Sequence, residues 1–555
     1  MSDTLDRFFD HYYRYRPVNA TFTGVHSFDD RLPDWSLGGL AEMDSQMRSL
    51  HGELMQASPP AATLLQGDPQ QLDITLARSF LEIQLAENDC GHGRRGTPAR
   101  WVGESVFSII SLMIRPFAPL NERLASATAR LSAIPSFLQH AELTIGARRL
   151  PESWMMKALR ECEGAEVLLT DGMAKWVASE VHDESLDAGL LAAAGRARMG
   201  FDRFAVWLRN RSAAPESAMG CGTELFDLLL THGHMCPTPR AELLANARAR
   251  LIEARAKLDE MARAASGSWA EAQNALASRH PTVNEYFNTF HDTWHACHAL
   301  AQSRDVVSWP DWPIRYVAYP EFTAAAAPFL YYLHYRSPAP FDAYTIHDYV
   351  VPAPPVANGD AFLRTWNDGT IKLNHVVHHG AIGHHVQNWH AYHQSSSRVG
   401  QVAAVDCANR IGMFCAGTMA EGWACYATQL MDELGFLTPL EQVSEQHTRV
   451  RMLARAVVDI ELHQKSMSFS DAIRFYMEQA GMPEPAARGE ATKNSMFPCT
   501  AIMYWLGTKG ILDLRDAMRA QRGEGFTLRA FHDDVLSRGS IPVALLSRLM
   551  TQVAA

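Results

Sequence analysis

The sequence predicts one large, mainly α-helical body with a small β element around residues 305–357. Apolar residues recur at helical spacing along most of the chain, while alternating strands joined by hairpin turns and internal repeats are absent. At roughly 100–200 residues per domain, length alone would suggest about three to five domains. We expect a single domain over residues 1–555, because the helices after residue 357 complete the chemistry described below.

The predicted helices share helix-forming residues with apolar positions three and four residues apart. In chain order they cover residues 120–134, 155–177, 241–264, 449–464 and 470–479. Residues 305–357 differ, because nine prolines disfavour a long helix there. Two short β-type runs, 314–318 and 344–351, lie between these prolines and predict a small sheet. It separates an N-terminal helical half of about residues 1–300 from a C-terminal half of about residues 358–555.

Composition excludes several classes of protein. The 20% charged and 47% apolar residues are typical of a globular chain and exclude extensive disorder. No apolar run reaches the roughly 18 residues of a membrane span, and we expect no membrane partner. The net charge is −11, and the sequence shows no stripe of basic residues. Both observations argue against a protein that binds nucleic acid.

The first residues and the cysteines predict a cytoplasmic protein. The N-terminus lacks the basic and apolar regions of a signal peptide. Nine cysteines, an odd number without a C-x-x-C pair, indicate reduced thiols. The oligomeric state does not follow from the sequence.

Histidines are concentrated in one segment, which indicates metal or proton chemistry. His378 and His385 are seven residues apart and share a face of a straight helix, whereas His378 and His384 are six apart and do not. His384 would meet His378 at one ion only if the helix broke at residues 380–383, so periodicity favours His385. The alternative is a solvated, histidine-rich helix without metal. Seven histidines lie within these 19 residues: His375, His378, His379, His384, His385, His390 and His393.

Two strings resemble the motifs of a known family. Residues 378–387, HHGAIGHHVQ, resemble H-E-x-x-P-G-H-x-x-Q, and residues 421–426, EGWACY, resemble E-G-W-A-x-Y. Both motifs belong to the bacterial family numbered 885 among the domains of unknown function, which is described as metallopeptidase-like. Weaker matches at residues 17–30, 455–463 and 498–542 extend the resemblance over nearly the whole chain.

This resemblance implies a helical metallopeptidase-like fold with a deep cleft and a zinc-type site formed by His378, His384 and Glu421. It selects His384 against the periodicity argument, so we expect a local distortion of the helix at Gly383. The implied cofactor is one divalent metal ion, with zinc preferred, although histidine-rich ligation also suits iron, copper and nickel. The alternative is an empty or purely structural site.

The chain departs from the family at the positions that act on the substrate. His379 replaces the glutamate that serves as the usual general base, and Lys493 with Asn494 replaces an Arg-Tyr pair. The candidate ligands are retained, which indicates a site refitted for another substrate or reaction. His379 has three roles open to it: a base that accepts a proton, a fourth ligand that closes the site, or a bystander on the opposite helix face.

Five further residues have candidate roles, four of them with a structural alternative. Asp459 and His463 lie four apart on one helix face, so the carboxylate could orient an imidazole that carries a proton, or the two could form a buried structural pair. Tyr504 is a candidate oxyanion donor or a core tyrosine. Lys493 is a candidate for holding a substrate carboxylate, although a solvated surface lysine is favoured. His385 and Asp459 are expected to contact and orient the residues that form the site, without binding the metal themselves.

The leading functional expectation is a metal-dependent hydrolase that cleaves an amide or peptide-like bond of a small molecule or short peptide. The metal polarises the carbonyl, water attacks, and His379 or His463 moves the proton. Two alternatives remain. One is a metal-dependent lyase or isomerase of specialised metabolism, and the other is an inactive binding protein whose extra histidines saturate the ion.

Overall fold

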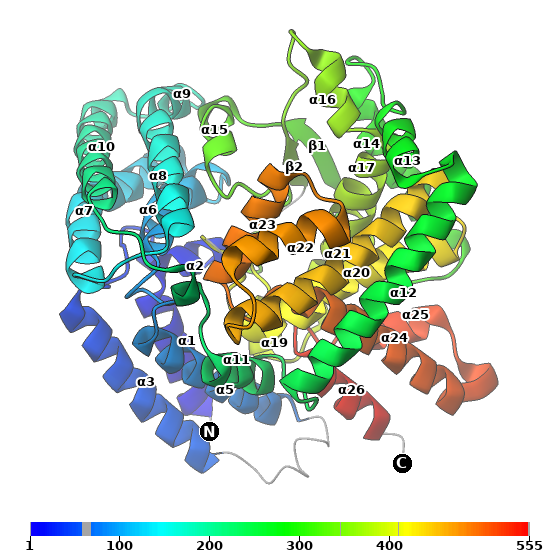
Figure 1. Ribbon diagram of the computed structural model, residues 1–555. Coiled ribbons are helices and arrows are strands. Elements are labelled where there is room, and N and C mark those ends of the chain that lie inside the picture. Colours follow the sequence, from blue (N-terminus) through cyan, green and yellow to red (C-terminus); the bar gives the residue numbers. More distant parts are fainter. Residues whose placement is uncertain (1, 58–67, 344–345, 409, 553–555) are drawn as a thin grey trace.

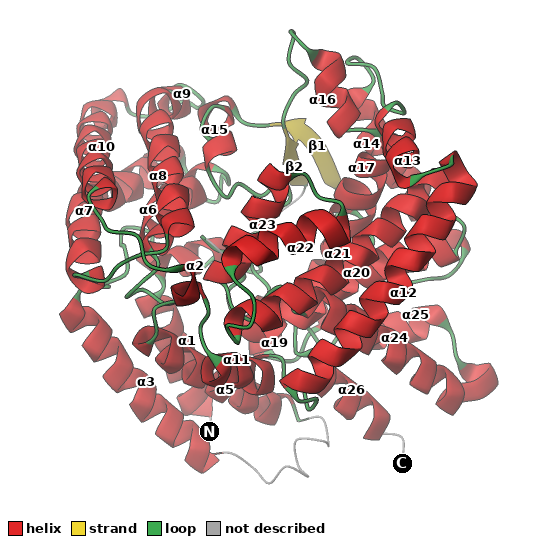
Figure 2. Cartoon of the chain, viewed as in Figure 1, coloured by secondary structure: helices red, strands yellow, loops and turns green. Residues whose placement is uncertain are grey.

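A computed structural model describes residues 2–57, 68–343, 346–408 and 410–552 of the chain. Helices dominate it, and Figure 2 shows one short pair of strands among them. The predicted mainly α-helical class with a small β element is therefore confirmed. No helix within the described ranges is long and apolar enough to cross a membrane.

Most of the N-terminal part forms one side of the molecule, coloured from blue to cyan in Figure 1 and green at its end. Its helices are α1 (Ser2–Tyr15), α2 (Pro17–Thr23), α3 (Leu37–Ala57), α5 (Pro69–Asp89), α6 (Pro98–Met113), α7 (Leu120–Ile145), α8 (Glu152–Val167), α9 (Met173–Val177), α10 (Asp187–Arg209) and α11 (Thr223–Leu228). Two π-helical turns extend α8 and α11: η2 (Leu168–Gly172) and η5 (Leu229–Gly233).

Most of the remaining helices form the other side, from green to red, whereas α15 (Glu321–Ala324) packs against α9 and η2 of the N-terminal part. The others are α12 (Arg240–Ser266), α13 (Trp269–Ala277), α14 (Tyr286–Ser303), α16 (Gly359–Thr365), α17 (Asp368–Thr370), η7 (Ile371–Gly380), α18 (His384–Gln394), α19 (Arg398–Val402), α20 (Gly417–Glu433), α21 (Pro439–His463), α22 (Phe469–Ala480), α23 (Glu484–Met496), α24 (Met503–Arg522), α25 (Leu528–Leu536) and α26 (Val543–Gln552). Short 3-10 turns are η1 (His26–Phe28), η3 (Glu184–Leu186), η4 (Glu216–Met219), η6 (Ala327–Phe329), η8 (Phe414–Ala416) and η9 (Gly523–Gly525).

The predicted helices are present, most of them longer than expected. The helix expected at 120–134 continues through Pro135 to Ile145 as α7. The helix expected at 449–464 begins earlier, at Pro439, where the Thr438 and Glu441 side chains form a reciprocal capping box. A second capping box, from Ser468 and Asp471, starts α22.

The small sheet lies in the proline-rich segment, as predicted. Strands β1 (Ile314–Ala318) and β2 (His347–Val351) pair in parallel, with Ile314 opposite His347 and Ala318 opposite Val351. Residues 344 and 345 of the second predicted run lie outside the described residues. The sheet backs the histidine segment, because the Tyr316 hydroxyl donates to the carbonyl oxygen of His375 at 3.2 Å.

The two halves of the chain share two apolar clusters. The buried residues of the larger one extend from Leu5 in α1 to Met550 in α26, and the second joins Phe226 of α11 to Tyr476 of α22. Helices α12 and α13 pack on α21, and α14 packs on η7, so the end of the N-terminal half lies against the C-terminal half. None of the nine cysteines forms a disulfide. The result is one large helical body.

Candidate metal centre

The histidine segment consists of two helices separated by a sharp turn. The wide π-helix η7 ends at Gly380, and Ala381 leaves helical geometry with φ −126° and ψ −120°. Helix α18 begins at His384, directly after Gly383. The predicted distortion at Gly383 is therefore a complete break in the helix.

Gly383 is required at this break because the backbone folds back on itself. Its amide N–H donates to the carbonyl oxygen of Val377 at 2.9 Å. A Cβ at residue 383 would lie 1.9 Å from the carbonyl oxygen of His378, far inside van der Waals contact. This tight return places the His384 ring 4.9 Å from that of His378, between ring centres. The structure thus pairs His378 with His384 rather than with His385.

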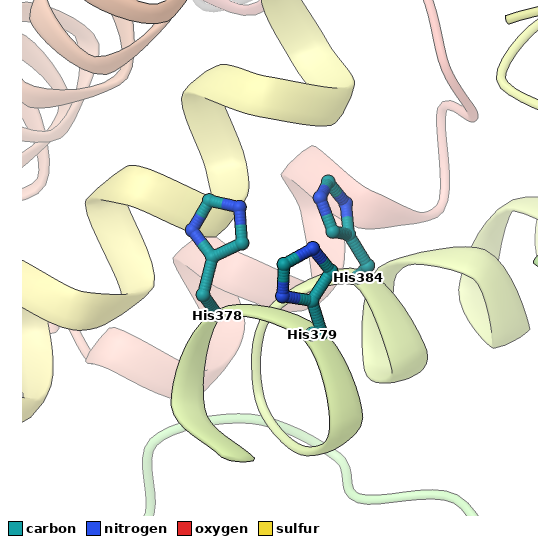
Figure 3. A group of neighbouring side chains, drawn as sticks. All are labelled: His378, His379 and His384. Carbon is teal, nitrogen blue, oxygen red and sulfur yellow. The ribbon is translucent and has the colours of Figure 1, made fainter. Parts of the chain in front are cut away.

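Three histidines and one glutamate converge beyond this turn. Figure 3 shows the rings of His378, His379 and His384 gathered around one space, and one nitrogen from each lies within 4.8 Å of the others. Glu421, from α20, adds a carboxylate. Its Oε2 lies 3.7 Å from Nε2 of His378 and 3.8 Å from Nε2 of His384.

This spacing fits a divalent ion. Distances of 3.7 and 3.8 Å are too long for hydrogen bonds, yet the three groups face one another while their side chains are only 14–20% exposed. A tetrahedral site with bonds of about 2.0–2.2 Å places donor atoms about 3.3–3.6 Å apart. The two distances from Glu421 are therefore close to the donor spacing of a zinc-type site.

Neighbouring groups orient the candidate ligands. Nδ1 of His384 lies 3.4 Å from Oε1 of Gln387, which leaves Nε2 free to face Glu421. Burial raises the pKa of Glu421, but the facing imidazoles of His378 and His384 outweigh this and hold it at about 2. The carboxylate is therefore ionised, as a metal ligand must be.

His379 belongs to the cluster rather than to the opposite helix face. Its Nδ1 lies 2.6 Å from the carbonyl oxygen of Asn374 and must donate to it. In the neutral ring, Nε2 then carries the lone pair. Burial, and then the neighbouring His378 and His384, lower the pKa of His379 well below its ordinary value. This geometry suits either a proton acceptor or a fourth ligand.

His379, His384 and Glu421 line a cavity of about 120 Å³, the site cavity. It adjoins a larger and more open cleft of about 1390 Å³, the outer cleft, and the two share Tyr331, Lys493 and Phe497 in their walls. The histidine cluster therefore lies beside a cavity that adjoins a surface cleft. The polar side chains that line the site cavity include His379, His384 and Glu421 together with Tyr331, Tyr335, Asn388, Asp406, Arg410, Glu490, Lys493, Asn494, Thr500 and Tyr504.

Tyr504 and Lys493 both line this cavity. The guanidinium carbon of Arg455 lies 4.7 Å from the Tyr504 ring centre. Burial, and then the charge of Glu421, raise the pKa of Tyr504, so its hydroxyl stays protonated. Nζ of Lys493 lies 6.0 Å from the Tyr331 ring centre, and Lys493 is a half-buried cavity residue rather than a solvated surface lysine.

Comparison with known proteins places this architecture in a family. The family model described as "Bacterial protein of unknown function (DUF885)" matches residues 17–550. The chain belongs to the DUF885 family.

Two solved structures show the same fold. A protein from Shewanella oneidensis superposes with a TM-score of 0.76 at 19% identity, covering 99% of both chains. A protein from Colwellia psychrerythraea gives a TM-score of 0.77 at 16% identity, again over 99% of both chains. Both are described as a "putative lipoprotein", the first of unknown function. No curated protein matches the sequence.

The DUF885-like string around Asp459 and His463 does not reach the site cavity. Both side chains are fully buried, with Nε2 of His463 3.6 Å from Oδ1 of Asp459. Nε2 of His463 donates to the carbonyl oxygen of Asn494 at 2.9 Å, and its Nδ1 accepts the amide N–H of Cys221 at 3.2 Å. Because both ring nitrogens are engaged with the backbone, His463 has no nitrogen available to carry a proton at the site cavity.

Asp459 instead supports the chain just before Tyr504. Its two carboxylate oxygens accept the backbone N–H groups of Cys499 at 3.0 Å and Ile502 at 2.9 Å. Burial raises the pKa of Asp459 to about 7, against the lowering effect of these bonds. Asp459 and His463 therefore form a buried structural pair, which was one of the two roles that the sequence left open.

His385 lies behind the cluster, fully buried against Trp312. Its Nε2 donates to the carbonyl oxygen of Trp312 at 2.8 Å, so Nδ1 accepts from the Tyr335 hydroxyl at 3.2 Å. Tyr335 also accepts from Nδ2 of Asn388 at 3.2 Å. Sequence reasoning missed Tyr331, Tyr335 and Arg410 as cavity residues, because none belongs to the motif strings.

Proposed function

We propose that the protein is a metal-dependent hydrolase that cleaves an amide or peptide-like bond of a small molecule or short peptide. The observation that carries this proposal is the convergence of His378, His384 and Glu421 at metal-ligand spacing beside the site cavity. The outer cleft supports it by offering a path for an extended substrate.

One divalent ion, preferentially zinc, would be held by Nε2 of His378, Nε2 of His384 and the carboxylate of Glu421. When bound there, such an ion polarises a carbonyl and makes water a nucleophile near neutral pH. The three donors form an open set, which leaves a position for substrate or water, as in catalytic rather than structural sites.

His379 is the proton carrier in this proposal. Its Nδ1–H is fixed on the carbonyl oxygen of Asn374, and its Nε2 lone pair faces the same space as the ligand atoms. Nε2 takes a proton from the attacking water and returns it to the leaving nitrogen. A histidine thus replaces the glutamate of the family motif in the same step.

Two other residues of the site cavity, Tyr504 and Lys493, bind the substrate. The protonated hydroxyl of Tyr504 donates to the carbonyl oxygen as negative charge develops on it. Lys493, at the junction of the site cavity and the outer cleft, attracts an anionic or carbonyl group of the incoming substrate. Both residues act by position and charge.

Metal content is the first test. Protein purified without a histidine tag is expected to hold about one zinc or iron per chain, and a His378→Ala/Glu421→Ala double variant is expected to lose it. No metal in the wild-type protein, even after dialysis against zinc, would overturn the proposal. A His295→Ala variant, which removes an exposed histidine of α14, serves as the control.

The reaction type is tested with labelled water and a library of short peptides and amides. Hydrolysis places the label in the carboxylate product, whereas a lyase or isomerase gives an unlabelled product. His379→Gln is expected to lower the rate by about 10²–10⁴ with the metal retained. His379→Glu restores the family's acid and is expected to keep or raise peptidase activity. Failure of every substrate with a fully loaded metal would favour the inactive binding protein.

A further inference from the structure

A second pocket, the arginine pocket, adjoins the site cavity. It has a volume of about 70 Å³ and shares four wall residues with the site cavity: Cys407, Arg410, Ile411 and Phe497. A ligand in one cavity is therefore next to the other. The charged side chains that line the arginine pocket are Arg16, Arg94, Arg100, Arg410 and Glu104.

Positive charge is in excess around this pocket. Arg410 is neutralised by Glu87, whose oxygens accept its two terminal nitrogens at 2.7 and 2.6 Å. Of the remaining charges that line the pocket, Glu104 can balance one arginine at most. Two guanidinium charges remain without a carboxylate among the lining residues and Glu87.

These arginines are almost completely removed from solvent. Arg16, Arg94 and Arg100 are only 5%, 6% and 8% exposed. Burying unbalanced charge is costly, and proteins normally compensate it with a counter-charge. The guanidinium groups of Arg16 and Arg94 do stack on aromatic rings, those of Phe80 and Trp35 at 4.7 Å each, but such contacts neutralise no charge.

Several hydrogen-bond donors of these arginines also lack an acceptor within the described residues. Arg100 has one ion-pair contact, 3.5 Å to Glu87, and its side chain donates no hydrogen bond to any part of the chain that the structure describes. Nη1 of Arg16 and Nε of Arg94 likewise lack an acceptor within the described ranges. Buried guanidinium donors without acceptors are rare, so their presence at a cavity points to a ligand that supplies oxygens.

We infer that the arginine pocket binds the anionic group, a carboxylate or a phosphate, of the molecule that occupies the site cavity. The guanidinium fork matches both oxyanions in shape and charge. The inference rests on the proposed function for its choice of partner cavity. It narrows the substrate to an anionic molecule whose charged end lies beside, not at, the bond that is cleaved.

Glu104 allows a test in which the effect on anion binding is opposite to that of an arginine variant. Burial raises the pKa of Glu104 to about 7, although Arg94 and Arg130 oppose this. Its carboxylate competes with an incoming anion for the same guanidinium groups. Glu104→Gln should therefore strengthen anion binding, whereas loss of an arginine should weaken it.

Binding is measured on the full chain after removal of metal with EDTA. Sodium phosphate and sodium succinate are titrated in a calorimeter at fixed ionic strength. At least one is expected to bind at a single site. Arg100→Met is expected to weaken it about 10- to 100-fold, the usual effect of losing a hydrogen bond to a charged group. Glu104→Gln should tighten it, and Arg250→Met, at an exposed position on α12, should leave it unchanged.

The two probes identify the anion, because preference for phosphate or for succinate separates the two ligand chemistries. If Arg100→Met does not fold, the anion affinities of Arg16→Met and Glu104→Gln test the inference instead. Absence of saturable binding by both probes, or affinities that Arg100→Met and Glu104→Gln leave unchanged, would overturn the inference.

Failure here is distinguishable from failure of the proposed function. With a cleavable substrate in hand, Arg100→Met should raise KM about tenfold or more for the form with a free carboxylate or phosphate, and should leave KM of its neutral amide unchanged. Arginine-dependent anion binding without any hydrolysis would contradict the proposed function alone. Hydrolysis in which Arg100→Met affects both forms equally would contradict the arginine pocket alone.

Discussion

Trp423 donates its indole N–H to the carbonyl oxygen of Ile382 at 2.9 Å, fully buried. This bond connects α20, the helix that carries Glu421, to the turn between His378 and His384. It therefore fixes the distance between the carboxylate and the two imidazoles. The E-G-W string thus contains both a candidate ligand and the residue that positions it.

Trp423→Phe keeps an aromatic ring but removes this hydrogen bond. We expect the free energy of unfolding to fall by about 1–3 kcal/mol, because the Ile382 carbonyl stays buried without its donor. Metal affinity should fall about 10- to 100-fold, as for other groups that orient ligands. Urea unfolding and competition with a chelator measure the two effects. Trp389→Phe, at a half-buried position on α18, is the control, and equal metal affinities in all three proteins would contradict the positioning role.

Gly383→Ala tests the break in the histidine segment. The new Cβ would lie 1.9 Å from the carbonyl oxygen of His378, so the turn must open. We expect a loss of about 1–3 kcal/mol or more in stability and a loss of metal binding. Gly195→Ala in α10 has no atom within 4 Å of the new Cβ and should stabilise slightly. A Gly383→Ala protein that binds metal normally would show that the tight turn is not needed.

His384 and His385 should respond in opposite ways. His384→Ala removes a candidate ligand whose side chain makes one long hydrogen bond, 3.4 Å to Gln387, so metal should be lost while the fold persists. His385→Ala removes two buried hydrogen bonds and a stacked ring, so stability should fall by about 2–4 kcal/mol with metal retained. Elemental analysis and urea unfolding of both variants decide the assignment. Loss of metal in His385→Ala alone would restore the periodicity-based pairing.

This pair of neighbours also shows what the sequence can predict about the site. Helical spacing correctly placed α12 and α22, because their apolar positions repeat without interruption. The same rule fails at His384, because it assumes a straight helix, and the break at Gly383 depends on how the backbone folds back. Only the motif resemblance indicated that break.

Spacing alone could not decide which face of α21 meets the cavity. Asp459 and His463 share a helix face, as expected, but that face points into the core towards Cys499 and Asn494. The arginine pocket could not be predicted from the sequence either, because Arg16, Arg100 and Arg410 come from distant segments that tertiary packing brings together. Tyr331 and Tyr335 lie in a proline-rich stretch that has no periodicity to interpret.

Glu445 predicts a pH dependence of stability that is independent of the metal site. This α21 residue is 2% exposed, and burial raises its pKa to about 7 from 4.5, although Arg449 opposes the shift. Between these pH values the folded protein holds a proton at Glu445 that the unfolded chain releases. The free energy of unfolding should therefore fall as pH rises from 4.5 to 7, by about 3 kcal/mol at most, and then level off.

Glu445→Gln removes the titrating group while keeping its size. Its stability should change less between pH 4.5 and 7 than that of the wild-type protein, so that the variant is the more stable of the two above pH 7. Urea unfolding at a series of pH values, on metal-free protein, measures the difference. Glu253→Gln, at an exposed position on α12, should follow the wild-type curve. Parallel curves for Glu445→Gln and the wild-type protein would mean that Glu445 is ionised in the fold, with Arg449 as its effective counter-charge at 3.4 Å.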